Sequence, residues 1–529
     1  MLAVASGFTA EEKDATRNIV ASTRVAWKKS LLPSIRLFTI GVSTIGGIDI
    51  IASSGGTNSD FWNYQYQDES AYLTGVSYER SLQMPAGGIN KGLAEVEFDN
   101  TSGRYTPRYM GGSSELYTAV QKPRRPLVIN AGFKYEGIDQ TIPQFVGLTS
   151  KVPALSARQK AIRIQAEDFI GFLENRYVDN TTMFTAQRTD QVIETILQRL
   201  GYGTAQYSLD YGINNIPFGI YEQGSKYIDV IQKLVQAENG QFYQDEEGIL
   251  RFENRQHWDS APYTQIQKVI TTSMVLDAKM PDDSHIINVV EVKGVPREKQ
   301  QLQRVFQGSG FSGTGAVMIP AGGTKEQWVS YDDPMLEIRT PTPATTSGDY
   351  SYFAANAAED SSGIDLTSSV YIKSIQNFAR ASKIVFGNNS ASIAFVTKLD
   401  IWGRPARRSG DIYARDIRGS SVTAYEERPY KIENEYIQSN SWAESYTQMI
   451  LRDFSSPENL QNITIRAIPE LQLGDLISWQ GRYWRIFGIK SKISPSVGFI
   501  QDIQLLQRTI TTYFRIGIST IGGSDRIAP

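Results

Sequence analysis

Apolar and polar side chains alternate along most of this chain, and one stretch from Thr189 to Asn254 breaks the alternation. Segments such as GLAEVEFDN (92–100) and AIRIQAED (161–168) have the two-residue period of a strand with one buried face. Within 189–254 the period becomes helical and then returns to that of a hairpin. We therefore predict a mainly β fold that contains an α+β subdomain.

The stretch that breaks the alternation predicts two helices followed by a hairpin. In TDQVIETILQRLGYG (189–203) the apolar side chains fall at helical spacing, Thr189 or Asp190 caps the start and Gly201 ends the helix. SKYIDVIQKLVQAENG (225–240) repeats this pattern, with Ser225 as the predicted N-cap. QFYQDEEGILRFEN (241–254) then reads as two short strands joined by a DEEG turn.

The rest of the chain predicts three further β-rich regions. Strand segments from about Asn63, separated by turn residues, indicate a first small barrel. A capping box at Ser441 to Glu444 opens another helix, and the four strand-like segments that follow it indicate a second, related barrel. The region 295–428 is rich in Gly, Ser, Thr and Ala, which predicts an inserted β-sandwich-like domain with long loops.

These patterns divide the chain into six predicted segments. A capping box at Thr9 to Glu12 predicts a polar helix that runs to about Lys29. The segments are an N-terminal helix and connector (1–62), the first barrel (63–175), the helix-pair and hairpin domain (176–275), the second barrel (276–294 and 429–510), the insert (295–428) and a C-terminal connector (511–529).

The composition excludes several kinds of site and disfavours several binding functions. The 529 residues include no cysteine and two histidines, which excludes disulfides, thiolate metal sites and cysteine nucleophiles. The formal net charge of −3 disfavours broad binding to nucleic acid or to anionic membranes, because both need concentrated positive charge. The sequence contains no run of 18 apolar residues, so it predicts no membrane-spanning helix. We expect no cofactor and no metal ion.

A short peptide occurs twice, once near each end of the sequence. Residues 38–52 and 514–528 are identical at 11 of 15 positions, and each copy contains a diglycine turn. The spacing from Gly41 to Gly46 is that of a phosphate-binding loop, but neither copy has the lysine that reaches the phosphates. We interpret each copy as a strand and turn that connects domains or subunits.

Adjacent carboxylates and one histidine-containing run are the candidate catalytic groups of the sequence. Asp245, Glu246 and Glu247 are adjacent, but they fall in the predicted turn, where we expect them to be solvated rather than to act as a hydrolytic pair. The run from Asp282 to His285 contains serine, histidine and aspartate, yet it lacks the glycine-flanked nucleophile turn of a hydrolase. No catalytic constellation emerges, and we predict that the chain is not an enzyme.

Two further features have structural explanations. His257 follows a predicted strand and is expected to be a core or hydrogen-bonded histidine. RPARRSGDIYARDIRG (404–419) is locally basic, but acidic residues are interspersed through it. We predict an ion-paired β surface there rather than a nucleic-acid site.

The order of short motifs resembles that of tail-tip or baseplate hub proteins (minor tail proteins) of tailed bacteriophages, including the hubs of contractile tails. EVEFDNTSGRYTP, RRPLVINAGF, PQFVGLTSKV and IRIQAED resemble the first barrel of that family, although Arg124 stands where the family has glycine. The hairpin matches its pattern at Gly240, Phe242, Tyr243, Asp245, Gly248, Leu250, Arg251 and Phe252. Leu473-Gly474-Asp475 fits the expected turn of the second barrel. The likeness extends from about Asn63 to Arg508 and is interrupted by the insert.

The resemblance implies a virion protein made in the cytoplasm of a bacterial host. It implies a homotrimer whose two related barrels alternate around a ring, which joins a hexameric tail tube to a three-fold tip. The implied partners are a distal tail or tail tube protein above, and tape-measure, tip or fibre proteins below. DNA would pass through without specific binding. Because the sequence stops soon after the second barrel, no cell-wall-degrading region is implied.

Two alternatives to a purely structural hub remain open. The inserted domain could bind host glycan as a receptor-binding module, or the chain could hydrolyse cell-surface glycan. For the hub reading, the repeated peptides are the candidate assembly contacts, each expected to dock by β-addition. The residues concerned are Ile40, Ser43, Ile45, Gly46, Gly47 and Asp49 in the first copy, and Ile516, Ser519, Ile521, Gly522, Gly523 and Asp525 in the second.

Overall fold

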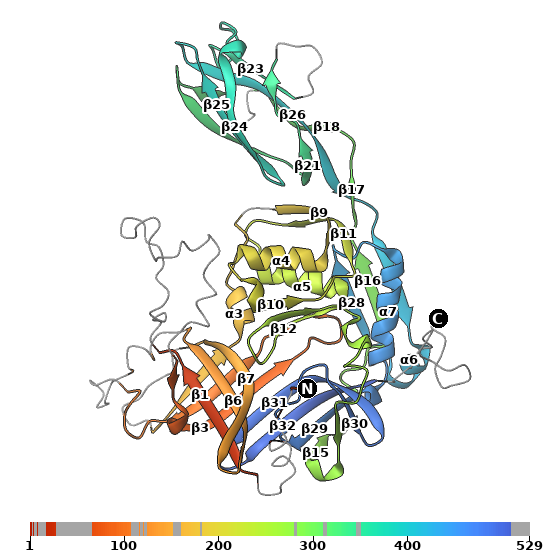
Figure 1. Cartoon of the computed structure of the whole chain (residues 1–529). Coiled ribbons are helices and arrows are strands. Elements are labelled where there is room, and N and C mark those ends of the chain that lie inside the picture. The colour runs from red at the N-terminus through yellow and green to blue at the C-terminus, as the bar shows by residue number, and fades with distance from the viewer. Residues whose placement is uncertain are drawn as a thin grey trace, which may run out of the picture.

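The structure is a computed structural model and is mainly β, with a small α+β part, as predicted (Figure 1). Two barrels, a helical layer and a projecting sandwich make up the molecule. The described residues are 1–2, 4, 8, 17–27, 66–106, 116, 120, 124–151, 160–179, 182–279, 283–309, 315–344 and 351–508.

Several strands of the first barrel alternate between buried and more exposed side chains, and Phe98, Ile129 and Phe145 lie in the barrel's core. Its strands are β1 (Ile19–Val25), β2 (Gln67–Asp68), β3 (Leu73–Ser81), β5 (Leu93–Asp99), β6 (Pro126–Tyr135), β7 (Ile138–Thr149) and β8 (Ala161–Glu167). The buried Glu69 brings β1 close to β3, since its amide donates to the Thr23 carbonyl oxygen and its carboxylate accepts from Trp27 Nε1 at 2.7 Å.

The predicted N-terminal helix was wrong for residues 19–25. The capping box predicted a helix to about Lys29, but Ile19–Val25 is a strand that pairs antiparallel with β6 along its whole length. Its β-branched residues and the buried Val25 fit the barrel wall, so tertiary pairing overrides the local helical signal. The first barrel therefore begins earlier than residue 63.

The second barrel uses strands that lie far apart in the sequence. They are β14 (Lys268–Ile270), β15 (Val275–Lys279), β29 (Leu460–Arg466), β30 (Leu476–Trp479), β31 (Arg482–Ser494) and β32 (Gly498–Arg508). Ile465, Ile477, Ile486 and Leu505 are fully buried in its core. The order around the barrel is β14, β30, β31, β32, β29 and β15.

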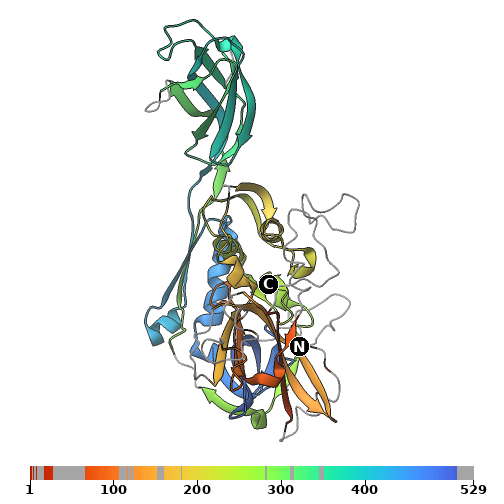
Figure 2. The ribbon, with the colours of Figure 1, turned by 90° about the vertical axis from the view of Figure 1, so that its left-hand side faces the viewer.

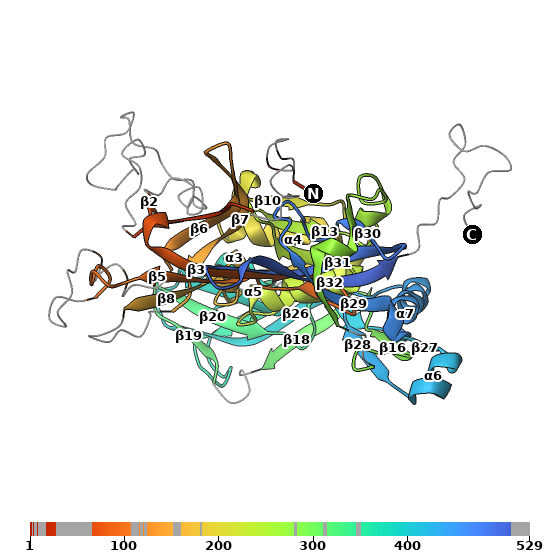
Figure 3. The same ribbon diagram turned by 90° about the horizontal axis from the view of Figure 1, so that it is seen from below.

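One strand belongs to both barrels. Arg482–Arg485 of β31 pairs with β30, which completes the second barrel. After a register shift between Ile486 and Gly488, the same strand pairs antiparallel with β3 of the first barrel from Ser81 to Val76. A 13-stranded sheet of the described residues therefore runs through both barrels, and Figure 3 shows β3, β31 and β32 side by side.

The α+β unit packs above the barrels, and its two main helices are those that the helical period predicted. The helices α4 (Thr189–Arg199) and α5 (Tyr227–Glu238) bury Ile193, Ile196, Ile231 and Leu234, and Asn239 ends α5 in the left-handed region with φ 54°. The surrounding elements are α3 (Phe169–Leu173), β4 (Gly88–Ile89), β9 (Thr182–Arg188), β10 (Tyr207–Leu209), β11 (Asn215–Tyr221), β12 (Gln241–Gln244) and β13 (Leu250–Glu253). The short α3 was not predicted.

A second layer joins this unit where the sequence predicted other domains. The strands β16 (Val289–Gly294), β27 (Ile412–Ile417) and β28 (Pro429–Asn434) form a three-stranded sheet that packs with α7 (Asn440–Phe454). Their buried side chains share one core with α4 and α5. The strand 289–294 was expected in the second barrel, and 412–417 and α6 (Gly419–Tyr425) in the insert, so the strand pairing differs from the predicted division there.

The insert is a two-layered sandwich on a narrow neck, which confirms the predicted β-sandwich-like domain (Figure 2). One layer contains β17 (Arg297–Lys299), β18 (Gln303–Ser309), β19 (Val317–Ile319), β21 (Met335–Ile338), β22 (Thr342–Pro343), β23 (Tyr352–Asn356) and β26 (Ala394–Arg408). The other contains β20 (Thr324–Ser330), β25 (Ala381–Asn388) and β24 (Val370–Asn377). Phe353, Phe386, Val396 and Leu399 fill the core between the layers.

Candidate functional site

The two repeated peptides lie outside the described residues, so the structure does not place Ile40, Ser43, Ile45, Gly46, Gly47, Asp49, Ile516, Ser519, Ile521, Gly522, Gly523 or Asp525. Their attachment points are described. The first copy lies between β1 and β2, which both belong to the first barrel. The second follows β32 of the second barrel. One copy is therefore tethered to each barrel, although the first interrupts its barrel instead of preceding it.

A buried ion pair joins the hairpin to both barrels, and this corrects the prediction that its turn acids are solvated. Glu246 is 3% exposed, and its Oε2 lies 2.5 Å from Nη1 of Arg80 at the end of β3. Its other oxygen accepts a hydrogen bond from Gln472, which precedes β30. Burial opposes the charged form of Glu246, but the Arg80 guanidinium and these hydrogen bonds hold its pKa below the ordinary value.

The neighbouring Asp245 organises the turn. Its Oδ1 accepts from the backbone amides of Glu247 and Ile249, and its Oδ2 lies 2.6 Å from Nε of Arg251. Burial and the adjacent Glu246 raise its pKa in spite of Arg251. Glu247 is exposed. Because Asp245 and Glu246 both contact arginines inside the fold, their arrangement is that of a structural junction and gives no support to a hydrolytic pair.

His257 is hydrogen-bonded, as predicted. Its Nδ1 lies 2.7 Å from Oδ2 of Asp210, and its Nε2 lies 3.2 Å from Oε1 of Glu253. Burial of the ring opposes the charged form, but the hydrogen bond to Asp210 and the charge of Glu253 raise the pKa of His257 above its ordinary value. The cluster fastens the end of the hairpin beside the second barrel, where Trp258 contacts Arg485 and Gly474.

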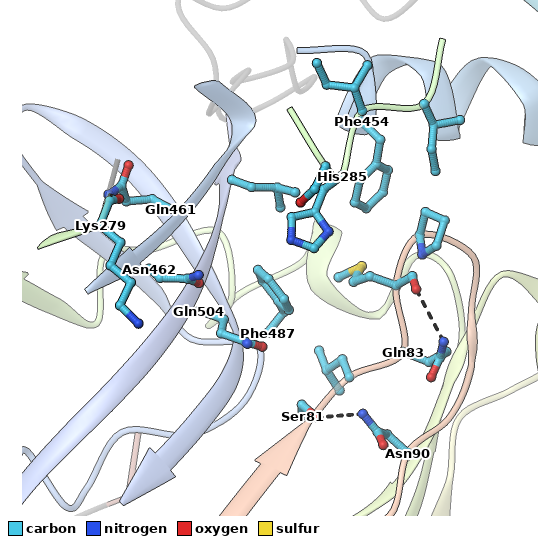
Figure 4. A pocket seen from close by; sticks show the side chains of 17 residues that line it. Ser81, Gln83, Asn90, Lys279, His285, Phe454, Gln461, Asn462, Phe487 and Gln504 are labelled. Carbon is cyan, nitrogen blue, oxygen red and sulfur yellow. Dashed lines mark hydrogen bonds between the residues drawn. The ribbon is translucent and has the colours of Figure 1, made fainter. Parts of the chain in front are cut away.

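His285 lines a pocket of about 570 Å³ where the second barrel meets the end of α7 (Figure 4). The wall combines the aromatic Phe454 and Phe487 with amides such as Gln83 and Gln504. No carboxylate is present among the described lining residues.

The pocket does not assemble the serine, histidine and aspartate that were considered from the sequence. Ser284 and His285 both line it, but Oδ2 of Asp283 pairs with Nη2 of Arg428 at 3.2 Å. Asp282 lies outside the described residues. Within the described part of the chain, no group of three or more histidine or acidic side chains could hold a metal ion. No helix among the same residues is long and apolar enough to span a membrane.

The second barrel exposes an apolar surface that the sequence interpretation missed. Ile266, Val269 and Leu276 are 43%, 58% and 52% exposed. They lie on or beside β14 and β15, each of which pairs on one side only within the described chain. We call Ile266, Val269 and Leu276 the apolar edge. Unpaired strand edges with apolar side chains are sites of association, so the apolar edge is a candidate assembly surface.

The basic segment 404–419 is an ion-paired β surface, as predicted. Arg404 pairs with Glu337 at 3.0 Å, Arg407 with Asp333 at 2.7 Å and Arg415 with Glu291 at 3.3 Å. Each of these three arginines is neutralised by an acid from a neighbouring element, whereas Arg408 and Arg418 of the same segment are exposed. Because most of its arginines are ion-paired, the segment does not concentrate positive charge as a site for a phosphate backbone would.

Comparison with known proteins finds similarity in structure alone. No protein-family model and no curated protein matches this chain. A 43 kDa tail protein of prophage MuSo2 from Shewanella oneidensis is 12% identical, with a TM-score of 0.43 over 83% of this chain and 95% of that one. A tail protein from Neisseria meningitidis is 8% identical, with a TM-score of 0.42 over 93% and 98%. A component of the type VI secretion system of E. coli is 8% identical, with a TM-score of 0.35 over 83% and 74%. Tail proteins are thus among the solved structures to which this chain is similar.

Proposed function

We propose that this chain is the structural hub of a phage or phage-like tail tip or baseplate. Three copies form a ring in which the two barrels of each subunit alternate, and the ring joins a hexameric tail tube to a three-fold tip. The protein resides in the virion after synthesis in the cytoplasm of its bacterial host. It has no catalytic role in this proposal.

The shared strand β31 is the observation that carries the proposal. A ring of alternating barrels needs two barrels held at a fixed angle within each subunit, since a flexible joint would not define a closed symmetry. Backbone pairing between β3 and β31 and the buried contact of Glu246 with Arg80 provide such a joint. A binding module with one ligand site would not need two barrels fused through a common sheet.

The apolar edge supplies the contact between subunits in this proposal. Ile266, Val269 and Leu276 would pack against the first barrel of a neighbouring copy, and this would cover the unpaired strands β14 and β15. The repeated peptides would add a strand to equivalent sites on the barrels of a sister subunit or on adjoining tail proteins. Their attachment to different barrels suits contacts on both sides of the ring.

The neighbours follow from this position. A distal tail or tail tube protein lies above the ring, and tape-measure, tip or fibre proteins lie below it. DNA passes through the lumen without specific binding, which suits a chain with a formal net charge of −3.

Analytical ultracentrifugation of Val269→Asp combined with Leu276→Asp tests the proposal. Charges at the apolar edge should convert trimers to folded monomers, because burying an unpaired carboxylate in an interface is unfavourable. Ile364→Asp is the matched control, since Ile364 is 75% exposed on the insert. If the unaltered protein sediments as a monomer at all concentrations, the hub proposal is wrong. If the double variant and the control both remain trimeric, the assignment of the contact to the apolar edge is wrong.

A further inference from the structure

The outer face of the β20–β25–β24 layer of the insert carries exposed aromatic rings in fixed positions. Strand register places Trp328, Lys383 and Gln376 in one row across the face, and Glu326, Val385 and Ser374 in the next. Thr324, Gly387 and Tyr371 form a third row. Trp328 is 50% exposed and Tyr371 is 40% exposed. We call Trp328, Phe378 and Tyr371 the aromatic platform.

The orientation of the Trp328 side chain is fixed by a ring contact and a hydrogen bond. Its ring stacks on Phe378 with centroids 5.4 Å apart and an interplanar angle of 19°. Its Nε1 donates to Oε1 of Glu326 at 3.0 Å, and the other oxygen of Glu326 lies 2.7 Å from Nζ of Lys383. A large apolar ring is therefore presented to solvent in one orientation, with little side-chain entropy left to lose on binding.

The Tyr371 ring is held in position by its contact with a glycine. Its ring covers Gly387 so closely that a Cβ at that position would lie 2.4 Å from Cζ of the tyrosine. The absence of a side chain at Gly387 is what lets this ring lie over the strand. An aromatic ring that lies over a cross-strand glycine is a rigid contact surface, and the exposed 40% of the residue remains available to a ligand.

The two fixed rings lie a short polymer segment apart. Trp328 on β20 and Tyr371 on β24 lie two strand spacings apart across the sheet and four residues apart along it, which corresponds to roughly 16 Å. The side chains between them offer hydroxyl and charged hydrogen-bonding groups from Thr324, Glu326 and Ser374. Just beyond Phe378, Arg380 pairs with Glu222 of the body at 3.0 Å, so this end of the sheet lies next to the body.

We propose that the aromatic platform binds a neutral glycan chain. Pyranose rings have apolar C–H faces that pack on aromatic rings, and hydroxyl rims that pair with the polar side chains between them. The face carries no surplus charge at its centre, because Lys383 pairs with Glu326, and this argues against an anionic polymer such as nucleic acid. The sandwich projects away from the barrels (Figures 1 and 2).

The experiment is isothermal titration calorimetry of the full-length protein with cellohexaose, maltohexaose and chitohexaose. At least one hexaose should bind saturably. Trp328→Ala and Tyr371→Ala should each weaken that binding about tenfold or more, which corresponds to about 1.4 kcal/mol. Trp328→Phe should retain part of the affinity, because it keeps a ring over Phe378.

Tyr413→Ala is the matched control, since Tyr413 is a 60% exposed aromatic residue on a β-sheet face of the body. It should bind as the unaltered protein does, and circular dichroism should show all variants folded. The proposal is overturned if none of the three hexaoses binds, or if both platform variants bind normally. It is also overturned if no hexaose binds and Trp328→Ala instead abolishes association with another tail protein. None of these results depends on the trimer, so the hub proposal stands or falls separately.

Discussion

The barrels and the inserted sandwich use the same kind of strand but are stabilised in different ways. In the body, β31 belongs to both barrels, and Glu246 of the hairpin contacts Arg80 of the first barrel and Gln472 of the second, so each part depends on the others. The sandwich has its own core and meets the body through its neck strands and the Arg380–Glu222 pair. We infer that the body is one cooperative unit and the sandwich is a separable arm.

The largest effect should follow from breaking the buried pair. Glu246→Ala leaves Arg80 as an unpaired buried charge, and we expect the body to lose about 3–5 kcal/mol of unfolding free energy. Urea denaturation followed by intrinsic fluorescence measures this loss. Glu247→Ala is the control, because that side chain is exposed and should change stability by less than about 0.5 kcal/mol. Equal effects of the two variants would contradict the account of the junction.

A comparable loss should be confined to the arm when its core is opened. Phe386 is fully buried between the two layers of the sandwich, and Phe386→Ala should destabilise the arm by about 3–5 kcal/mol. Hydrogen exchange should show faster exchange in 315–408 and unchanged protection in the barrels. If β29 to β32 also lose protection, the arm and the body are one cooperative unit.

The contrast between regions also shows what the sequence could predict. Period and turn chemistry predicted α4, α5 and the hairpin, because in each the neighbours in sequence are also neighbours in space. Composition and strand-like segments predicted the sandwich, but not that its strand β26 pairs with the remote β17 and β18. They did not predict that Ile19–Val25 pairs with β6 or that Val289–Gly294 joins β27 and β28, since those partners are remote. Helix caps were displaced as well, with Ser439 and not Ser441 accepting from the amide of Trp442.

The candidate site was predictable only in part. Glu246 was expected to be solvated because a DEEG turn is normally at the surface, and nothing local indicates that Arg80 lies against it. The sequence signal for the apolar edge and for Trp328 is weak, because it consists of an apolar residue on the polar face of a strand. That signal becomes informative only once the strand register is known. The assembly residues predicted in the repeats lie outside the described chain and stay a prediction.

A pH-dependent effect should appear at Asp168, the N-cap of α3. Burial raises its pKa to about 7, although the amides of Gly92, Ile170 and Gly171 oppose this shift. Its contribution is complete below pH 4 and should be lost as the pH rises to 7, because the folded state retains a proton that the unfolded chain releases. Stability of the body should fall by at most about 1.4 kcal/mol per pH unit in this window.

Asp168→Asn removes the titrating group and checks this assignment. The variant loses the bond from the Gly92 amide and should be less stable throughout, but its stability should depend less on pH between 4 and 7 than that of the unaltered protein. Guanidinium denaturation at several pH values measures both slopes. An unchanged slope would show that another group is responsible.

A gain in stability is expected at Arg485 of β31, which is buried against Trp258. The side chain is 6% exposed, its Nε and Nη1 have no hydrogen-bond partner, and burial together with Arg508 lowers its pKa to about 9. Arg485→Met keeps most of the volume and removes an unpaired charge, so we expect stability to rise by about 1–3 kcal/mol. Thermal unfolding of the variant measures the change, and a loss of more than about 2 kcal/mol would contradict it.

Deleting most of the arm should have the smallest effect on the stability of the body. Glu298 and Arg407 are register partners in the neck, so 299–406 can be replaced by an Asn-Gly turn that joins them directly. The shortened chain should keep the unfolding midpoint of the body and its oligomeric state, and should lose glycan binding. Calorimetry and sedimentation test both points, and an unfolded or aggregated product would show that the arm supports the body.

Electron cryo-microscopy of the assembled tail particle tests the central claim most directly. The account predicts a three-fold ring at the junction of tube and tip, in which three chains contribute alternating first and second barrels around an open lumen. It further predicts that each pair of barrels within a chain is joined through β3 and β31. A ring with one barrel per chain, or this protein located away from the junction as a monomer, would contradict it.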